Sequence, residues 1–476
     1  MVFSSPTFLF YFFPLFFFFY FVSGRRNAVV FLLSLLFYAW GGPGYVPLLL
    51  FYIVANYLMG LALGATRNAR WVLALGIAVN LALLLVYKYL GFLVDQLDGL
   101  LAWLGGGGVP HVALTLPLGI SFFSFQGMSY LIDISRGQVV PQRSLLKFAM
   151  YKTMFPQLIA GPIVRYRHIA GKIDGRRVSL FRLRHGMMLF SLGLAQKCLI
   201  ANTVAYPADA IFKLPAEQLT TGAAWLAAVC YMMQIFFDFS GYSNMAIGMG
   251  HMMGFSFPAN FNRPYVAQSV TEFWRRWHMS LSSWFRDYLY LPLGGNRRGP
   301  GRTYVNLFAV FVLCGLWHGA NWTFAAWGLF HGCFLVAERL GLSRGLSRLW
   351  QPLRHLYLLL AVCAGWVIFR SETLAQALHF FAVMSGWADG TAVMAPAGRY
   401  LTGSVVAALA VAVAGILMPR LSERAAQRRA RRLLGQLALA DGAVALAFGA
   451  GSLALAVAAA FSVATNTYNP FIYFRF

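Results

Sequence analysis

Long apolar runs recur from one end of this chain to the other, and they constrain its fold more than any other feature. Each run has about 15 to 23 residues, close to the length that a helix needs to cross a ~30 Å hydrocarbon core. Lipid gives the backbone no hydrogen-bond partners, so a crossing run must be a helix or a barrel strand, and the alternating pattern of a barrel is absent. The clearest runs are Thr7–Val22, Leu48–Leu63, Trp71–Val86, Trp225–Phe239 and Ala443–Val463. The sequence therefore predicts an all-α polytopic membrane protein.

The composition agrees with a membrane location and leaves few groups for chemistry, because 59% of the 476 residues are hydrophobic and 11% are charged. The segment Met1–Phe8 has no basic stretch, and the run that follows does not end in small residues. We therefore expect a retained first span rather than a cleaved signal peptide. The five cysteines are scattered singly in apolar segments without a CxxC pair, which predicts buried, unreactive thiols.

The net charge of +24 is concentrated in a few loops between the spans, which argues against a surface for nucleic acid. By the positive-inside rule, loops rich in lysine and arginine are cytoplasmic and loops that carry acids are external. The basic loops are residues 25–26, 67–70, 136–147, 165–184, 263–302, 344–354 and 420–432. This alternation places both termini outside. Two explanations of the basic loops stay open: orientation together with anionic lipid, or an added role in holding a polyanionic cytosolic ligand.

Threading spans through this alternation gives about ten to twelve crossings in one membrane domain, residues 1–476. Two segments do not fit the alternation, because each lies between basic loops on the same side: Phe148–Val164 and Gly241–Asn260. Both are short and interrupted by glycine or proline. We expect them to be re-entrant or broken segments, which membranes tolerate only against protein or a water-filled cavity.

The segment Thr271–Gly299 predicts a basic amphipathic helix of the kind that lies in a membrane interface. Its aromatic side contains His278 between tryptophans, where a simple anchor needs no titratable group. Arg275 and Arg276 lie on the other side. The segment ends in a cationic turn, with Arg297 and Arg298, that suits phosphates, and no P-loop or dinucleotide-binding motif occurs.

The stretch LWHGANWTFAAWGLFHG holds two further histidines, His318 and His331. An ionisable group at membrane depth marks a site by default, and a desolvated neutral imidazole can act as a general base. The thirteen-residue separation places the two rings on different faces of an ideal helix. No HxxH, HExxH or paired carboxylate accompanies them, so no metal site is expected, and no nucleophile-elbow sequence supports a serine triad. A purely structural role, hydrogen-bonded inside the bundle, stays open for each histidine.

Two other stretches have a site-like composition. YMMQIFFDFSGYSN places Gln234, Asp238 and Asn244 in an apolar context, and FPQLIAGPIVRY combines helix breakers with Arg165. Broken helices expose backbone groups, which next to a cavity can serve as oxyanion or substrate donors.

These residues carry a family resemblance. WRRWHMSLSSWFRDYLYLPLGGNRRG followed by LWHGANWTFAAWGLFHG resembles the membrane-bound O-acyltransferase superfamily, in particular the bacterial branch with the alginate O-acetylation membrane protein. The likeness continues through MVFSSPTFLF, LPLGISFFSFQGMSYLIDISRG, FPQLIAGPIVRY, FDFSGYSNMAIGMGHMMGF and NPFIYFRF. Asn244 departs from the pattern, because this branch commonly has aspartate there.

The resemblance implies a ring of helices with re-entrant segments around a central tunnel. It implies acyl transfer from cytosolic acetyl-CoA, with no bound cofactor, and makes His318 essential as base or transient acyl carrier, with His278 as a second histidine. The candidate contacts for substrate or coenzyme A are Trp274, Arg275, Arg276, Gln234, Asp238, Arg297, Arg298 and Asn321.

The function expected from this resemblance is transfer of acetyl across the bacterial inner membrane toward an exported polysaccharide, alginate first. The implied partners are a periplasmic acetyl-accepting protein, the polysaccharide and the lipid bilayer. Cellulose, peptidoglycan or teichoic acid as acceptor stay open. So do two other classes, a secondary transporter and a non-catalytic scaffold of a polysaccharide export complex.

Overall fold

The computed structural model describes residues 1–66, 69–112, 114–388, 397–418, 438–465 and 468–470. These residues form helices and connecting segments, and no strand occurs among them. The longer helices are α1 (Phe13–Val22), α2 (Arg26–Gly41), α3 (Val46–Ala65), α4 (Ala69–Leu84), α5 (Leu90–Trp103), α6 (Ile120–Ser135), α7 (Leu145–Thr153), α10 (Leu180–Ala195), α11 (Asn202–Ile211), α12 (Thr221–Met252), α15 (Gly299–His318), α16 (Trp322–Ala337), α18 (Gln351–Arg370), α19 (Leu374–Met384), α20 (Gly403–Leu417) and α22 (Ala438–Thr465). The predicted all-α class is confirmed.

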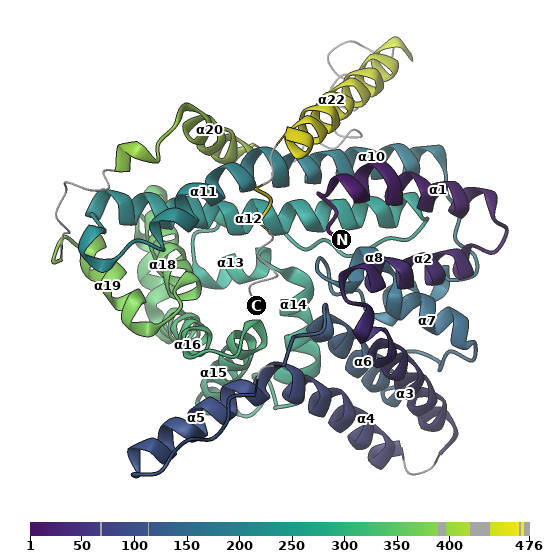
Figure 1. Cartoon of the computed structure of the whole chain (residues 1–476), viewed down its shortest axis with the longest axis horizontal. Helices are drawn as coiled ribbons and strands as arrows, with labels where there is room; N and C mark the ends of the chain where they lie inside the picture. The colour runs from purple at the N-terminus through teal and green to yellow at the C-terminus, as the bar shows by residue number, and fades with distance from the viewer. Residues whose placement is uncertain (67–68, 113, 389–396, 419–437, 466–467, 471–476) are drawn as a thin grey trace.

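Shorter helical segments connect these helices. They are η1 (Phe8–Phe12), η2 (Pro43–Tyr45), η3 (Leu85–Tyr89), α8 (Phe155–Leu158), α9 (Tyr166–Ile169), η4 (Ala170–Lys172), η5 (Gln196–Ala201), η6 (Ala216–Gln218), η7 (Pro264–Val266), α13 (Val270–Arg276), α14 (Met279–Phe285), η8 (Arg286–Tyr290), η9 (Glu338–Leu342), α17 (Ser343–Arg348) and η10 (Ala397–Arg399). In Figure 1 the longer helices surround α13 and α14, which lie near the middle of the view.

Six continuous helical stretches of the described chain are long and apolar enough to cross a membrane. They are Pro43–Ala65, Ala69–Trp103, Leu180–Ile211, Thr221–Met252, Gln351–Arg370 and Leu446–Thr465. Four shorter apolar helices accompany them: Phe8–Val22, Arg26–Gly41, Leu374–Met384 and Gly403–Leu417. The five apolar runs that the sequence singles out are all helical, as predicted. The chain is therefore a polytopic membrane protein, whereas the count of ten to twelve crossings stays a prediction.

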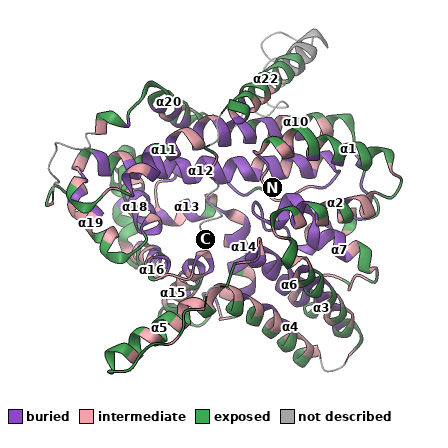
Figure 2. Cartoon of the chain, viewed as in Figure 1, coloured by how far each residue is buried: buried purple, intermediate pink, exposed green. Residues whose placement is uncertain are grey.

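Burial separates an inner group of helices from an outer one. Figure 2 shows buried residues concentrated in α12, α13 and α14, whereas α5 and α22 are largely exposed. Most of the exposed side chains of α5 are apolar, among them Leu93, Leu97 and Trp103, and the exposed polar ones are Asp95 and Gln96. A long helix with an apolar outer surface fits a position that faces lipid rather than water.

The first apolar run packs into the core. Phe8, Phe12, Phe16 and Tyr20 lie one helical turn apart and are all buried, so a single face of this helix contacts the rest of the protein. The loop at the other end of the chain meets this region, because the Asn469 amide donates to the backbone oxygen of Ser4 at 2.9 Å. The two ends of the described chain therefore lie on the same side of the molecule, consistent with the predicted common location of the termini.

One of the two predicted broken segments is confirmed. Between Phe148 and Val164 the chain leaves α7 at Met154, forms the single turn α8 and continues without regular structure. Every residue of this segment is buried. It therefore meets the condition for irregular backbone at membrane depth, which is contact with protein.

The other prediction, a break in Gly241–Asn260, is wrong for its first half, because α12 continues without interruption to Met252. The glycines that suggested a break serve packing against α10 instead. A Cβ atom added to Gly241 would lie 2.6 Å from the carbonyl oxygen of Gly193, and one added to Gly248 would lie 2.5 Å from that of Gly186. Two helices in backbone contact at two points seven residues apart need glycine at both.

The prediction of one interfacial helix over Thr271–Gly299 is also wrong. The segment is divided into α13, α14 and η8, and its aromatic side chains are buried inside the protein rather than displayed to an interface. The division occurs at His278, which adopts the left-handed conformation with φ 41° and ψ 52°. A single residue in this conformation turns the chain and ends the continuous helix.

Candidate active site

His278 lies at the turn between α13 and α14 and is 1% exposed. Its Nδ1 atom is 3.0 Å from the Oδ1 atom of Asn260, and the same oxygen accepts a hydrogen bond from the Ser280 hydroxyl at 2.8 Å. The Asn260 amide nitrogen donates to Ser243 at 3.0 Å. The backbone N–H of Ser280, which can only donate, lies 3.4 Å from Oδ1 and so fixes the orientation of the amide. Since Oδ1 can only accept, Nδ1 of His278 must be the donor.

This hydrogen bond determines what the other ring nitrogen can do. A neutral imidazole has one donor and one acceptor nitrogen, so Nε2 of His278 carries the lone pair. Nε2 is buried and has no hydrogen-bond partner among the described residues. His278 is thus arranged as a proton acceptor at Nε2, with Asn260 holding the tautomer.

His318 is the last residue of α15, and its ring lies among aromatic side chains. The ring centroids of Trp327 and Phe369 are 5.4 and 5.2 Å from that of His318, in edge-to-face contact. Trp317 lies on the side toward the other histidine, since its centroid is 4.9 Å from His318 and 6.2 Å from His278. The structure therefore brings the two predicted catalytic histidines together around Trp317.

The end of α15 is held by the kinked rod formed by α4, η3 and α5. The Tyr89 hydroxyl donates to the backbone oxygen of Leu316 at 2.7 Å. The Lys88 ammonium donates to the backbone oxygens of Trp317 and, at 3.0 Å, His318. These are carbonyl groups that a helix end leaves without intrahelical partners. Two adjacent residues of a π-helical turn thus fix the backbone that carries His318.

Packing of α15 against α16 sets the position of His318 from the other side. A Cβ atom added to Gly315 would lie 2.0 Å from the carbonyl oxygen of Phe324, and one added to Gly328 would lie 2.2 Å from that of Phe311. Both positions require glycine, because the two backbones are in direct contact. Asn321 starts α16, and its side chain accepts a hydrogen bond from the Thr323 amide at 3.0 Å.

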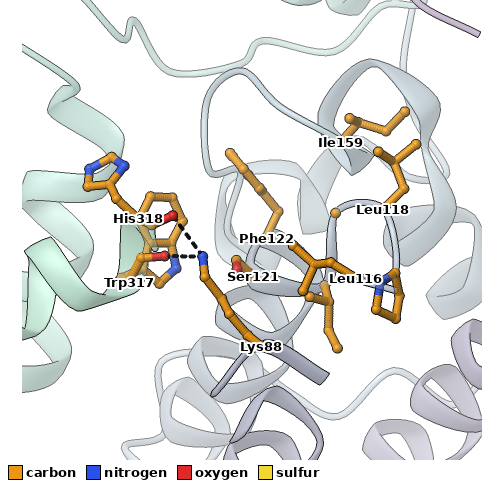
Figure 3. A pocket seen from close by; sticks show the side chains of 11 residues that line it. Lys88, Leu116, Leu118, Ser121, Phe122, Ile159, Trp317 and His318 are labelled. Carbon is orange, nitrogen blue, oxygen red and sulfur yellow. Dashed lines mark hydrogen bonds between the residues drawn. The ribbon is translucent and has the colours of Figure 1, made fainter. Parts of the chain in front are cut away.

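In the described part of the chain, three of the cavities along the α15–α16 hairpin contain predicted site residues. The first, of about 120 Å³, is lined by Lys88, Leu116–Phe122, Ile159, Trp317 and His318. Figure 3 shows the Lys88 ammonium pointing at the two backbone oxygens, with the His318 ring on the far side of it from Leu118 and Ile159.

The other two cavities are lined by different predicted residues. One of about 370 Å³ contains Asn321, together with Phe369, whose ring touches His318. One of about 200 Å³, with an apolar lining, contains Trp274 and Arg275. The predicted residues are therefore distributed over separate cavities of one hairpin.

The remaining predicted arginines do not meet the histidines. Arg276 forms an ion pair with Glu272 at 2.7 Å. Arg297 and Arg298 directly precede α15, whose last residue is His318, so a helix of 20 residues separates them from the imidazole. At 1.5 Å per residue this is roughly 30 Å.

The predicted polar residues of α12 have structural partners. Asp238 forms a buried ion pair with Lys197 at 2.9 Å, and Asn244 donates to Gln196 at 2.8 Å. Gln234 is buried in the same helix. Other residues of α12 contact the histidine site: the ring centroid of Phe239 is 4.6 Å from that of His278, and Ser243 accepts the hydrogen bond from Asn260.

Arg165, from the confirmed broken segment, also has a structural partner. Its guanidinium is buried and forms an ion pair with Asp287 of η8 at 2.7 Å. This contact ties the broken segment to the turn that follows α14.

His331 is fully buried in α16, and neither ring nitrogen has a hydrogen-bond partner among the described residues. Its centroid is 5.1 Å from the rings of both Trp274 and Trp327. His318 packs against the same Trp327 ring, so one tryptophan contacts both histidines. The chain breaks at Gly319–Asn321, so the angle of an ideal helix does not apply across it.

The sequence analysis missed Lys88, Tyr89 and Asn260. A lysine within an apolar helix is by itself a signal of function. The predicted span ended at Val86, just before it, whereas the helical stretch runs from Ala69 to Trp103. Asn260 carried no such signal, because an asparagine in a loop is ordinary. Within the described part of the chain no group of three histidine, cysteine or acidic side chains is placed to hold a metal ion.

Comparison with known proteins agrees with this arrangement. The model described as "MBOAT, membrane-bound O-acyltransferase family" matches residues 136–361. A relative from Pseudomonas putida named "Probable alginate O-acetylase" is 41% identical over all of both chains. One of the same name from Pseudomonas aeruginosa is 43% identical over 87% of this chain and 80% of its own length. The "Peptidoglycan O-acetyltransferase" of Helicobacter pylori is 35% identical over 81% of this chain and 80% of its own.

The family and these relatives are acyl-transferring enzymes, which sets aside the transporter and scaffold alternatives. Three findings point to the same family. They are the 41% identity with the Pseudomonas putida relative over the full length of both chains, the apolar helices, and the match of the family model to residues 136–361. The chain belongs to the membrane-bound O-acyltransferase family and is an O-acyltransferase.

Proposed function

We propose that this protein is an O-acetyltransferase that takes acetyl from cytosolic acetyl-CoA and passes it across the inner membrane of a bacterium toward exported alginate. The choice of acceptor is supported by the relatives. Those named for alginate are 41% to 44% identical, against 35% for the relative named for peptidoglycan and 30% for a "Teichoic acid D-alanyltransferase" of Bacillus subtilis. Peptidoglycan is the second candidate acceptor.

The observation that carries the chemistry is the convergence of His278 and His318 on the two sides of Trp317. A thioester is already activated, so transfer needs a positioned acceptor, a base and stabilisation of developing charge. One buried and one half-buried imidazole in an aromatic site can supply the base with less competition from hydrolysis than in water.

In the proposed mechanism His318 is the base. It removes the proton of the acceptor hydroxyl while the hydroxyl oxygen attacks the thioester carbonyl, and the imidazolium then returns the proton to the leaving coenzyme A thiolate. In the alternative sequence the His318 imidazole attacks the thioester carbonyl first and coenzyme A leaves as the thiolate. The acceptor hydroxyl oxygen then attacks the acetyl-imidazole, the bond from acetyl to the ring breaks, and the hydroxyl proton passes through the imidazole to the thiolate.

His278 is the second proton acceptor of the proposed site. Asn260 holds its Nδ1 as the donor, which leaves the Nε2 lone pair directed into the interior. The left-handed backbone at this position, uncommon for any residue other than glycine, supports a functional role for the residue.

The donor is proposed to approach along the apolar cavity that contains Trp274 and Arg275. An apolar lining suits the acyl and pantetheine arm, and a guanidinium at its edge suits a phosphate. Arg297 and Arg298, roughly 30 Å from His318 along α15, are proposed to lie in the cytosolic loop and to attract the nucleotide end.

The proposed topology places the basic loops in the cytosol and both termini in the periplasm. The contact between Ser4 and Asn469 supports a common side for the termini. All of residues 1–476 are proposed to form one membrane domain, and a periplasmic acetyl-accepting protein is proposed to receive acetyl before the polysaccharide.

The test is acetyl transfer by the full chain purified into lipid nanodiscs, with labelled acetyl-CoA as donor. Alginate oligosaccharide and peptidoglycan fragments are offered separately, each with periplasmic extract. The variant is His318→Ala. The backbone oxygen of this residue, rather than its ring, receives the Lys88 hydrogen bond, so the variant keeps the anchor of α15. We expect wild type to acetylate alginate and the folded variant to lose at least about 100-fold in kcat.

The control is His379→Ala, which removes a half-buried histidine of α19 that lies outside the candidate site and contacts the backbone oxygen of Ala216. We expect it to match wild type in activity and thermal stability. Wild type that acetylates peptidoglycan alone would move the acceptor to the second candidate. Full activity of His318→Ala would remove that residue from the mechanism, and inactivity of wild type with every acceptor would refute the proposed function.

A further inference from the structure

Lys88 is an unusual residue for its place in the fold. It lies in the π-helical turn η3, inside a continuous apolar stretch from Ala69 to Trp103 that is largely exposed to lipid. A lysine at membrane depth costs at least about 2.5 kcal/mol on insertion scales. Such a group is retained where it has a partner or a task.

The partners of Lys88 are neutral. Its ammonium donates to the backbone oxygens of Trp317 and His318, and its Nζ atom lies 5.9 Å from the centroid of the Trp317 ring. No carboxylate forms an ion pair with it among the described residues. The C-terminal end of α15 offers a partial negative charge of about one half, which leaves part of the positive charge without compensation.

Capping of α15 does not require that charge. Tyr89, the next residue in the same turn, caps the preceding carbonyl group of α15 with a neutral hydroxyl. The π-helical turn brings both side chains to one helix end, and such turns are frequent at functional sites. A second tyrosine or a glutamine in place of Lys88 would cap as well at a lower cost of insertion, so the ammonium has a further role.

The surroundings indicate what that role is. Lys88 lines the cavity of about 120 Å³ that reaches Trp317 and His318, and its ammonium lies 3.0 Å from the backbone oxygen of His318. Figure 3 shows the ammonium between that cavity and the ring. Acyl transfer builds negative charge on the carbonyl oxygen, and a fixed cation in a water-poor site lowers the energy of that state.

We propose that Lys88 is the positioning residue of the acyl-transfer site: it fixes the backbone of His318 through two carbonyl groups and keeps a positive charge beside the imidazole while negative charge develops. This inference rests on the proposed function. The helical stretch formed by α4, η3 and α5 would then take part in the reaction, because Lys88 lies in its π-helical turn η3.

Three substitutions separate the two parts of the role. Lys88→Arg keeps the charge and the donors, Lys88→Gln keeps donors without charge, and Lys88→Met keeps neither. In the acetyl-transfer assay above, we expect Lys88→Gln and Lys88→Met to lower kcat about 100-fold with KM changed less than about threefold, and Lys88→Arg to recover activity to within about tenfold of wild type.

The matched control is Lys152→Met. Lys152 is a fully buried lysine, whereas Lys88 is half-buried, and it too donates to a backbone oxygen, that of Phe123 in α6. It measures what loss of a buried ammonium costs elsewhere in the same protein. Thermal unfolding of every variant in nanodiscs distinguishes lost chemistry from lost structure.

The inference is overturned if Lys88→Gln is as active as Lys88→Arg, because a neutral donor would then suffice. It is also overturned if the loss appears in KM alone, which would indicate binding of an anionic acceptor, or if Lys152→Met lowers kcat equally at unchanged thermal stability. Failure of the proposed function is distinguishable, because wild type itself would then transfer no acetyl.

Discussion

Gly315→Ala is the sharpest test of how helix packing controls this site. Alanine is the better helix former by roughly 1 kcal/mol, so local propensity alone predicts a more stable α15. The structure predicts the opposite. The added Cβ atom would lie 2.0 Å from the carbonyl oxygen of Phe324, and ordinary van der Waals contact begins at 3.4 Å. The two atoms must therefore separate by the difference, 1.4 Å.

The displacement of α15 that Gly315→Ala causes also moves His318, the proposed base. His318 lies one helical turn after Gly315, so it moves with the displaced segment of α15. Lys88 and Tyr89 hold the same turn to another helix, so a displacement that large lengthens or breaks their hydrogen bonds. A misplacement of about 1 Å at a reacting group costs about 100-fold in rate. We expect kcat of Gly315→Ala to fall by about that factor.

The assay is acetyl transfer from labelled acetyl-CoA in nanodiscs, with thermal unfolding measured on the same preparation. The matched control is Gly301→Ala, the same substitution in the same helix at a position where the added Cβ atom meets nothing within 4 Å. We expect the control to keep wild-type kcat. Equal kcat and equal thermal stability for the two variants would refute the argument that backbone contact between α15 and α16 positions His318.

Two further substitutions test the other parts of the site. His278→Asn suits the left-handed backbone and is expected to unfold at nearly the wild-type temperature with kcat lowered at least about 100-fold; wild-type kcat would exclude His278 as a proton acceptor. Burial alone would raise the pKa of Asp287, but hydrogen bonds from Arg286 and Arg165 hold this pKa below its usual value. Its stabilising effect is therefore present above the unfolded-state pKa of about 3.9 and disappears as pH falls through the lower folded-state pKa. Asp287→Asn is expected to lose on the order of 3 kcal/mol at pH 7 and to flatten the acid side of the stability curve, measured by unfolding between pH 7 and 3; an unchanged curve would contradict the ion pair with Arg165.

The sequence by itself predicts the features that depend on neighbouring residues. Apolar length and the lack of alternation predict spanning helices, and the five runs that it singled out are helical. Helix breakers in Phe148–Val164 predict the buried irregular segment. The position of His318 at the end of a span, and the composition around it, identify it as a candidate without any knowledge of its neighbours.

Glycine shows where such reasoning ends. Glycine weakens an isolated helix, but Gly241 and Gly248 let α12 touch α10, because the backbone of α10 occupies the space that a side chain would fill. The local sequence around such a glycine is the same whether it breaks the helix or packs against a partner. Only the presence of the partner helix decides which of the two occurs. The opposite occurs at His278. The helix is interrupted there although the segment contains no glycine or proline at that point, because Asn260 of a distant loop hydrogen-bonds the residues of the turn.

What the sequence determined, then, is an all-helical membrane protein with a histidine at the end of one helix, because helix length, apolarity and capping are encoded within a few turns. What only the tertiary structure decided is which groups surround that histidine. Lys88 and Tyr89 precede their partners in α15 by 227 to 230 residues, and contacts over such separations arise from helix packing rather than from any local pattern.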